Sequence, residues 1–221
     1  MAEQLIFDLA SRPALHADNY FISKSNASAI ELLDKWPDWP EPSIILCGPE
    51  SCGKSHFVNV WRNLSGARKS HASELDEPLV ENLSDCKNLV IEDIDQGLKD
   101  ETALFHILNL TKEKNNRLLL TTRKMPGDFH PILPDLRSRL RSLPVFTIDQ
   151  PDDHLLKTIL LKLFDDRQLN IEPDVLNYIF THIDRSMSSI LEFVNKLDHA
   201  SLTSQKKITK HFARKIIDNK Y

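Results

Sequence analysis

The sequence is poor in the residues that mark several protein classes. Its 221 residues include only five glycines and three cysteines, and it has no low-complexity tract. The cysteines, Cys47, Cys52 and Cys86, lack metal-ligand spacing, and an odd number is a poor framework for disulfides. We therefore expect free thiols in a reducing compartment, the cytoplasm.

Long apolar runs and an excess of positive charge are also missing. No segment approaches the roughly 18 apolar residues of a membrane span, and the short N-terminus lacks the regions of a signal peptide. Lys and Arg total 28 against 32 Asp and Glu, which gives a net charge of -4. Because no apolar run is long enough, we expect no membrane association. Because binding to duplex DNA usually needs a basic face, we also expect no direct sequence-specific DNA binding.

Two of the five glycines fall in one motif. Residues 48–55 match the phosphate-binding pattern G-x-x-x-x-G-K-[ST] and read Gly48, Pro49, Glu50, Ser51, Cys52, Gly53, Lys54, Ser55. An apolar run at 44–47 precedes the motif, and His56 begins a segment that can continue as a helix. In such loops the backbone N–H groups bind phosphate, the Lys reaches the β and γ oxygens, and the Ser hydroxyl ligates Mg²⁺. The motif predicts nucleotide binding.

A second candidate site follows the apolar run 89–91, which is followed directly by Glu92 and Asp93. Nucleotide-hydrolysing sheets hold Mg²⁺ and orient a water with acids at a strand end, although such acids are often part of a solvated turn. Since the acids follow a phosphate loop, we expect Glu92 to assist the metal and Asp93 to polarise the attacking water. Asp95 is expected to be a cap of a helix or turn.

Predicted strands alternate with helices in the first two thirds of the chain, and only helices are predicted after that. Runs at 44–47, 88–91, 117–122 and 145–148 predict buried strands, and Leu104, Ile107, Leu108 and Thr111 mark one face of a helix between them. Helical stripes cover 155–164, 175–183 and 187–197, with Pro173 at a helix start and a short helix around 212–217. We predict an α/β domain with a parallel sheet at 25–150, after an arm at 1–24, and a small helical domain at 151–221.

These features together resemble an AAA+ P-loop ATPase with a helical lid domain. More narrowly, the chain resembles the bacterial replication initiator DnaA and its shorter paralogue Hda. The resemblance rests on residues 18–22 with Ser25 and Asn26, the phosphate loop, residues 136–140 and residues 197–202. The stretch 36–40 is similar to the alphaproteobacterial (HdaA) branch.

The resemblance implies roles for further residues. Arg139 matches the arginine finger that acts on nucleotide held by a neighbouring subunit, and Thr122 matches the polar strand end near the phosphates. Tyr20, Phe21 and Ile22 would lie against adenine, or could equally form an arm packing on the lid. Ser188 stands where the family's lid carries a sensor arginine, which weakens the case for ATP hydrolysis by this chain unless Arg185 can reach the site. ADP as a structural ligand is at least as well supported as ATP turnover.

The N-terminal arm carries a second motif. Gln4, Leu5, Phe7 and Leu9 resemble the peptides that bind the sliding clamp (beta subunit) of the bacterial DNA polymerase, in which Gln anchors and the apolar residues fill a pocket. Such a short peptide could also be an edge strand.

Three functions are compatible with these sequence features. The leading hypothesis is a clamp-bound, nucleotide-loaded adaptor that supplies Arg139 to ATP on DnaA, and this adaptor could form homo-oligomers. The alternatives are an initiator-like or helicase-loader-like ATPase that acts on origin DNA, and a small-molecule kinase. No basic recognition helix supports the first alternative, and no substrate motif supports the second.

Overall fold

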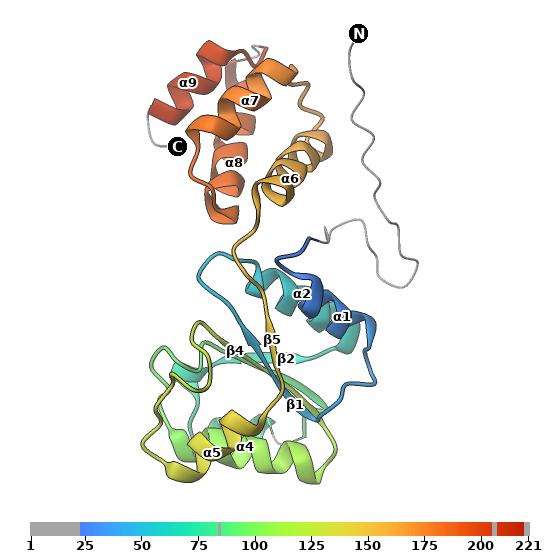
Figure 1. Ribbon diagram of the computed structural model, residues 1–221, viewed down its shortest axis with the longest axis vertical. Coiled ribbons are helices and arrows are strands. Elements are labelled where there is room, and N and C mark those ends of the chain that lie inside the picture. Colours follow the sequence, from blue (N-terminus) through green and yellow to red (C-terminus); the bar gives the residue numbers. More distant parts are fainter. Residues whose placement is uncertain (1–22, 84, 205–206, 219–221) are drawn as a thin grey trace.

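The computed structural model describes residues 23–83, 85–204 and 207–218, and Figure 1 shows two layers of helices around a sheet with a helical domain above them. The elements of the α/β part are α1 (Ala27–Asp34), β1 (Ser43–Cys47), α2 (Lys54–Ser65), β2 (Arg68–His71), α3 (Glu77–Leu83), β3 (Asn88–Glu92), α4 (Glu101–Glu113), β4 (Arg117–Thr122), α5 (Pro134–Ser142) and β5 (Val145–Thr147). The helical part comprises α6 (Asp153–Asp166), α7 (Pro173–His182), α8 (Met187–Ser204) and α9 (Lys210–Asp218).

The sheet is parallel, with the strand order β2-β3-β4-β1-β5. Strand β1, which leads into the phosphate loop, lies between β4 and β5, and β3 lies on the other side of β4. The carboxyl ends of these strands therefore meet at one edge of the sheet, as expected for a doubly wound α/β fold. This arrangement confirms the predicted fold class, and all four predicted strands are present.

Each face of the sheet is covered by its own set of helices. Ile44, Leu46, Val90 and Leu119 point to the face covered by α1 and α2, whereas Ile45, Leu89, Leu118 and Leu120 point to the face covered by α3, α4 and α5. Strands β1, β3 and β4 have runs of consecutive buried residues because helices shield both faces of these strands from solvent.

Three tryptophans pack together beside the face that α1 and α2 cover. Trp61 is fully buried on α2, its ring stacks on Trp39 with centroids 4.7 Å apart, and it meets Trp36 edge-on at 5.3 Å. The indole N–H of Trp39 donates to the carbonyl oxygen of Leu32 at 2.9 Å. The Pro-rich stretch after α1 is thereby fixed against the helix that follows the phosphate loop.

The helical domain has a separate core. Leu156, Leu160, Ile190 and Leu197 are among its fully buried members and belong to the predicted helical stripes, whereas Leu191 of the same stripes is 39% exposed. Pro173 lies at the start of α7, where its missing N–H has no intrahelical partner to lose. Among the described residues, no helix is both long and apolar enough to cross a membrane.

Three short elements of the α/β part were not predicted from the sequence, namely β2, α3 and α5. The sequence of β2 is Arg-Lys-Ser-His, which contains no apolar residue, and Ser70 is its one buried residue. An edge strand pairs on one side only, so polar side chains are tolerated there. Helix α3 has only seven residues, too few for a clear apolar stripe.

We expect Trp61→Ala to lower the free energy of unfolding by about 3–5 kcal/mol, because it empties the space under Trp36 and Trp39. Denaturant unfolding followed by circular dichroism measures this without relying on indole fluorescence. Leu64→Ala is the control on the same helix, since Leu64 is 40% exposed. An equal loss in both variants would show that the tryptophan cluster contributes little.

Candidate nucleotide-binding site

The phosphate loop connects β1 to α2 at the carboxyl edge of the sheet. The N–H of Gly48 donates to the carbonyl oxygen of Thr122 at 3.1 Å, which ties the loop to β4. Ser51 has φ 59° and Gly53 has φ 112°, both in the left-handed region. Alternation of right-handed and left-handed residues turns successive N–H groups into one concavity, the geometry that binds anions.

Gly48 is required at its position by contact with the rest of the sheet. A Cβ on this residue would lie 2.3 Å from the carbonyl oxygen of Ile148 and 2.7 Å from the Sγ of Cys52. Neither contact is sterically possible, so any side chain here would displace the loop. Gly53 has room for a Cβ, but its φ of 112° disfavours any other residue.

Lys54 lies folded against its own loop. Its side chain is buried, and its Nζ donates to the carbonyl oxygens of Gly48 at 2.6 Å and Pro49 at 2.8 Å. The ammonium is therefore held at the loop before any phosphate binds, and it has three donors with which to exchange partners. Ser55 and His56 follow on the first turn of α2 and are exposed.

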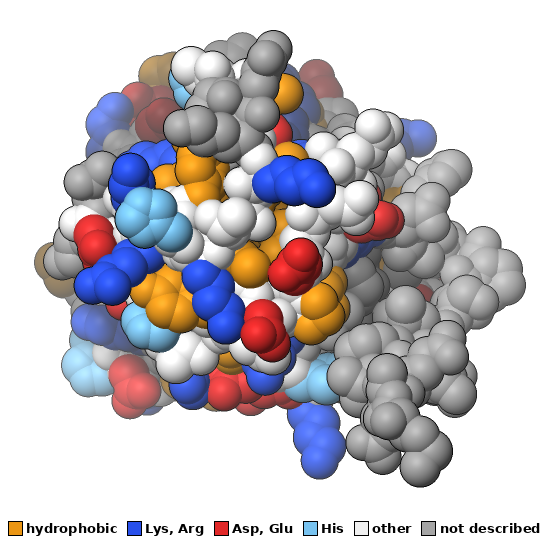
Figure 2. All heavy atoms as spheres, turned by 90° about the horizontal axis from the view of Figure 1, so that it is seen from above, with side chains coloured by type: hydrophobic (Ala, Val, Ile, Leu, Met, Phe, Trp, Pro, Cys, Tyr) orange, Lys and Arg blue, Asp and Glu red, His pale blue; other side chains and the backbone are white. Residues whose placement is uncertain are grey.

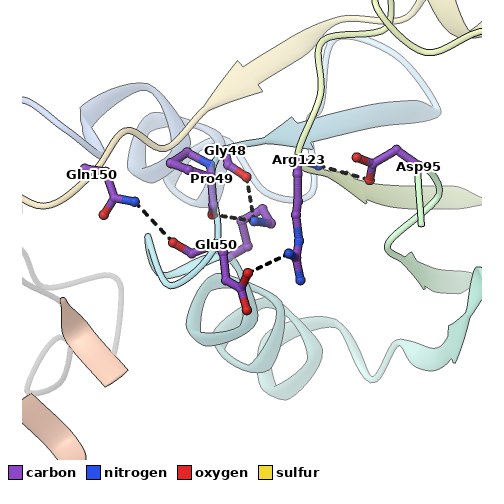
Figure 3. A network of polar contacts seen from close by, with 7 residues as sticks. Gly48, Pro49, Glu50, Asp95, Arg123 and Gln150 are labelled. Atoms are coloured by element: carbon purple, nitrogen blue, oxygen red, sulfur yellow. Dashed lines mark hydrogen bonds and ion pairs between the residues drawn. The ribbon is translucent and has the colours of Figure 1, made fainter. Parts of the chain in front are cut away.

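A polar network surrounds the tip of the loop (Figure 3). Arg123, directly after β4, forms an ion pair of 2.6 Å with the carboxylate of Glu50. The backbone N–H of Arg123 donates to Asp95 Oδ1 at 3.1 Å. From the other side, Gln150 Nε2 donates to the carbonyl oxygen of Glu50 at 3.2 Å. Asp95 thus ties its own turn to the residue that follows β4, a long-range contact and not the local cap that the sequence predicts. The segment that leads to the lid contacts the loop directly.

Burial raises the pKa of the Cys52 thiol, with Lys54 acting in the opposite direction. The same cause raises the pKa of Cys47. Both thiols are therefore protonated at neutral pH and are poor nucleophiles, and Cys52 is buried in the core beside α2.

The predicted acids lie at the end of β3, but they differ in their surroundings. Glu92 has a side chain only 8% exposed, and its Oε2 lies 2.9 Å from Lys69 Nζ and 3.6 Å from His71 Nε2. Asp93 is 39% exposed and has φ 59°, and its N–H donates to the Oγ1 of Thr121.

This arrangement does not fit Mg²⁺ held through Glu92, because that carboxylate already has a cationic partner. Ser55 does fit, since its hydroxyl is exposed beside the loop. In the part of the chain that is described, no group of three or more His, Cys, Asp or Glu side chains forms a metal-binding cluster.

Thr122 is buried at the end of β4, and its hydroxyl is used locally. The Oγ1 donates to the carbonyl oxygen of Lys124 at 2.8 Å and accepts from the Lys124 N–H at 3.1 Å. Its neighbour Thr121 lies on the same face as Glu92, because residues two apart in a strand share a face and β4 runs beside β3. The structure thus places Thr121 next to the acids and Thr122 on the opposite face.

The lid residue Arg185 is engaged within the lid itself. Its Nη1 lies 2.9 Å and 3.2 Å from the two carboxylate oxygens of Asp153 at the start of α6. Ser188 is the second residue of α8. The residues predicted to lie at adenine, Tyr20, Phe21 and Ile22, fall outside the described residues, as does the predicted clamp-binding peptide with Gln4, Leu5, Phe7 and Leu9.

Arg139 lies apart from the phosphate loop. It is half-buried on α5, and its Nη2 donates to the Oδ1 of Asn109 on α4 at 3.2 Å. Leu136 and Leu140 anchor α5 on the sheet face opposite to α2. Figure 1 shows α4 and α5 on one side of the sheet, and α1 and α2 on the other. Arg139 is therefore not part of the chain's own phosphate site.

Sequence reasoning missed three residues of this site, Arg123, Gln150 and Lys69. Arg123 directly follows a predicted strand, a position that could have drawn attention to it. Lys69 could not be placed, because the strand that carries it was not predicted.

The comparisons with known proteins agree with this fold. Residues 153–217 match the family model described as the Hda lid domain. An uncharacterized protein of Haemophilus influenzae is 26% identical over 194 residues, which cover 82% of this chain and 84% of that protein.

Two solved DnaA structures have the same fold. Domain III of Thermotoga maritima DnaA aligns with a TM-score of 0.74 and 17% identity, covering 91% of this chain and 95% of that one. AMPPCP-bound DnaA from Aquifex aeolicus aligns with a TM-score of 0.70 and 17% identity, covering 84% of this chain and 65% of that one.

The parallel sheet, the phosphate loop at its carboxyl edge and the helical lid define an AAA+ protein. Its fold is that of the AAA+ domain of DnaA, and its lid is of the Hda type. The chain is thus similar to Hda in its lid and to DnaA in its fold.

We expect Gly48→Ala to lower the melting temperature and to abolish any stabilisation by ADP. The added methyl group must displace the loop from Ile148 and Cys52, and such overpacking costs about 1–3 kcal/mol. Differential scanning fluorimetry with and without ADP measures both effects. Gly127→Ala is the matched control, because no heavy atom lies within 4 Å of its added Cβ. Full ADP stabilisation of Gly48→Ala would contradict the assignment of the loop.

Proposed function

We propose that this protein is a negative regulator of replication initiation: a nucleotide-bound adaptor that, on the sliding clamp, stimulates ATP hydrolysis by DnaA through Arg139. The observation that carries the proposal is the separation of two functional groups by the sheet. The phosphate loop joins α2 on one face, and Arg139 is on α5, anchored on the other. A guanidinium so placed serves a nucleotide on another molecule, as arginine fingers do.

The surroundings of Arg139 suit this role. Asn109 accepts one hydrogen bond from the guanidinium, which leaves other donors of the planar fork to meet a phosphate group. Leu136 and Leu140 are buried on the same helix, so α5 is a rigid base. The positive charge is thus presented from an ordered position, which reduces the entropy lost on docking.

The nucleotide of this chain is ADP or ATP, held by the loop from Gly48 to Ser55. Lys54 would exchange its carbonyl partners for phosphate oxygens, and the Ser55 hydroxyl is the group that would face a Mg²⁺ ion on the phosphates. Asp93 is the exposed acid that could polarise a water, with Thr122 at the end of the neighbouring strand β4. With Ser188 in place of a sensor arginine and Arg185 bound to Asp153, hydrolysis by this chain would be weak.

The clamp-binding part of the proposal rests on the sequence of the arm. Gln4 and Leu5, with Phe7 and Leu9, have the chemistry of a short peptide that docks through an amide anchor and an apolar plug. The adaptor would act in the cytoplasm, where its three free thiols remain reduced.

The alternative, an initiator-like or helicase-loader-like ATPase on origin DNA, has less support. Figure 2 shows the outer face of the lid, where Lys and Arg side chains are interspersed with Asp, Glu and hydrophobic ones. Counterion release on DNA favours a continuous basic surface, and this face does not present one. Self-association through Arg139 and the phosphate loop of a second copy remains compatible with the adaptor.

We expect Arg139→Ala to abolish stimulated hydrolysis of ATP on DnaA while leaving fold and nucleotide content unchanged. An arginine finger is worth roughly 10³–10⁵ in rate, so the loss should reach the unstimulated level. Phosphate release from ATP-bound DnaA with loaded clamp measures it. Arg141→Ala on the same helix is the control, since Arg141 is exposed and contacts only Gly127 in the hydrogen bonds described. Wild-type stimulation by Arg139→Ala would refute the mechanism in trans.

We expect the double substitution of Gln4 and Leu5 by Ala to abolish co-elution with the clamp. These residues supply the anchor and the first apolar plug, and a few such residues carry most of the energy of an interface. Size-exclusion chromatography of the mixture measures binding, and the melting temperature of the variant should equal that of the wild type. Retained co-elution of the double variant would show that clamp binding uses another surface.

A further inference from the structure

The side chain of Glu92 is neutralised by the neighbouring strand. Lys69 Nζ lies 2.9 Å from its Oε2, and His71 Nε2 lies 3.6 Å from the same oxygen. Only 8% of the Glu92 side chain is exposed, against 33% for Lys69 and 44% for His71. The acid is thus held beneath two basic side chains that separate it from solvent.

The register of the sheet dictates this contact. In the parallel pair of β2 and β3, Lys69 is opposite Val90 and His71 is opposite Glu92. Register partners point to the same face, and residues two apart on a strand also share a face. Lys69, His71 and Glu92 therefore share the face on which α2 packs. The ion pair of Lys69 and Glu92 is therefore set by the pairing of the two strands.

A compensated carboxylate has little attraction left for a metal ion. Mg²⁺ would enter a space within a few ångströms of an ammonium group, where the repulsion between like charges opposes it. It would otherwise have to displace Lys69 and leave that side chain without its partner. Mg²⁺ also gives up its water reluctantly and favours sites with uncompensated oxygen ligands.

We propose that Lys69 makes the nucleotide site independent of Mg²⁺. Its ammonium occupies the carboxylate that would otherwise help to hold the metal, so that Mg²⁺ adds little to the binding of ADP by the phosphate loop even where the Ser55 hydroxyl meets the ion. This inference rests on the proposed binding of adenine nucleotide. It assigns a specificity-determining role to a residue outside the phosphate loop, and it explains how the nucleotide is kept as a stable ligand without a complete hydrolytic site.

The test compares ADP affinity in Mg²⁺ buffer and in EDTA, by titration with a fluorescent ADP analogue. For the wild type we expect the two Kd values to agree within about threefold. For Lys69→Met, which leaves Glu92 uncompensated, we expect Mg²⁺ to tighten binding by about tenfold or more, as a nearby unpaired charge implies. Lys99→Met is the matched control, because Lys99 also forms an ion pair, with Asp76, and neither residue belongs to the phosphate loop.

A double variant, Lys69→Met with Glu92→Gln, guards against misfolding of the single one. It removes both charges, so it should fold and bind ADP without Mg²⁺ dependence. Loss of wild-type affinity in EDTA would overturn the inference but leave nucleotide binding intact. A Lys69→Met protein as indifferent to Mg²⁺ as the wild type would also overturn it. Absence of ADP binding in both buffers would refute the proposed nucleotide site itself, and the inference with it.

Discussion

The close approach of Gly48 to the backbone of Ile148 is the constraint on which the rest of the site depends. It sets the phosphate loop against the end of β5, while the Gly48 N–H fixes the loop to Thr122 at the end of β4. Because residues 147–150 continue directly into the lid, the same contact relates the lid to the loop. The hydrogen bond from Gln150 to Glu50 strengthens this connection. Movement of the phosphate loop by a nucleotide would therefore also shift the segment at which the lid begins.

The sheet separates the two chemical tasks of the proposed adaptor. One face, covered by α1 and α2, carries the phosphate loop and the pair of Lys69 and Glu92. The other face, covered by α3, α4 and α5, carries Arg139. Under this proposal the phosphate loop can favour retention of a nucleotide over its turnover, because Arg139 would act on a nucleotide held by another molecule. A weak hydrolytic site and a well-ordered finger are compatible properties of one chain.

The sequence predicts those parts of the protein whose signals are local. The buried strands and the lid helices have clear apolar patterns, and the phosphate loop has a fixed spacing of Gly48, Gly53 and Lys54. Contacts that depend on strand register could not be predicted in this way. Strand β2 has no apolar residue, so neither Lys69 nor its pairing with Glu92 could be foreseen. The local use of the Thr122 hydroxyl by Lys124 and the ion pair of Arg185 with Asp153 are likewise decided by tertiary structure.

The most direct measurement of the central claim follows labelled ATP bound to DnaA as it is converted to ADP. DnaA is mixed with DNA-loaded clamp and this protein, and each component is left out in turn. The account predicts rapid conversion only in the complete mixture, with ADP bound to this protein unchanged in amount. Equal conversion without this protein, or turnover of its own nucleotide in place of that on DnaA, would contradict the account.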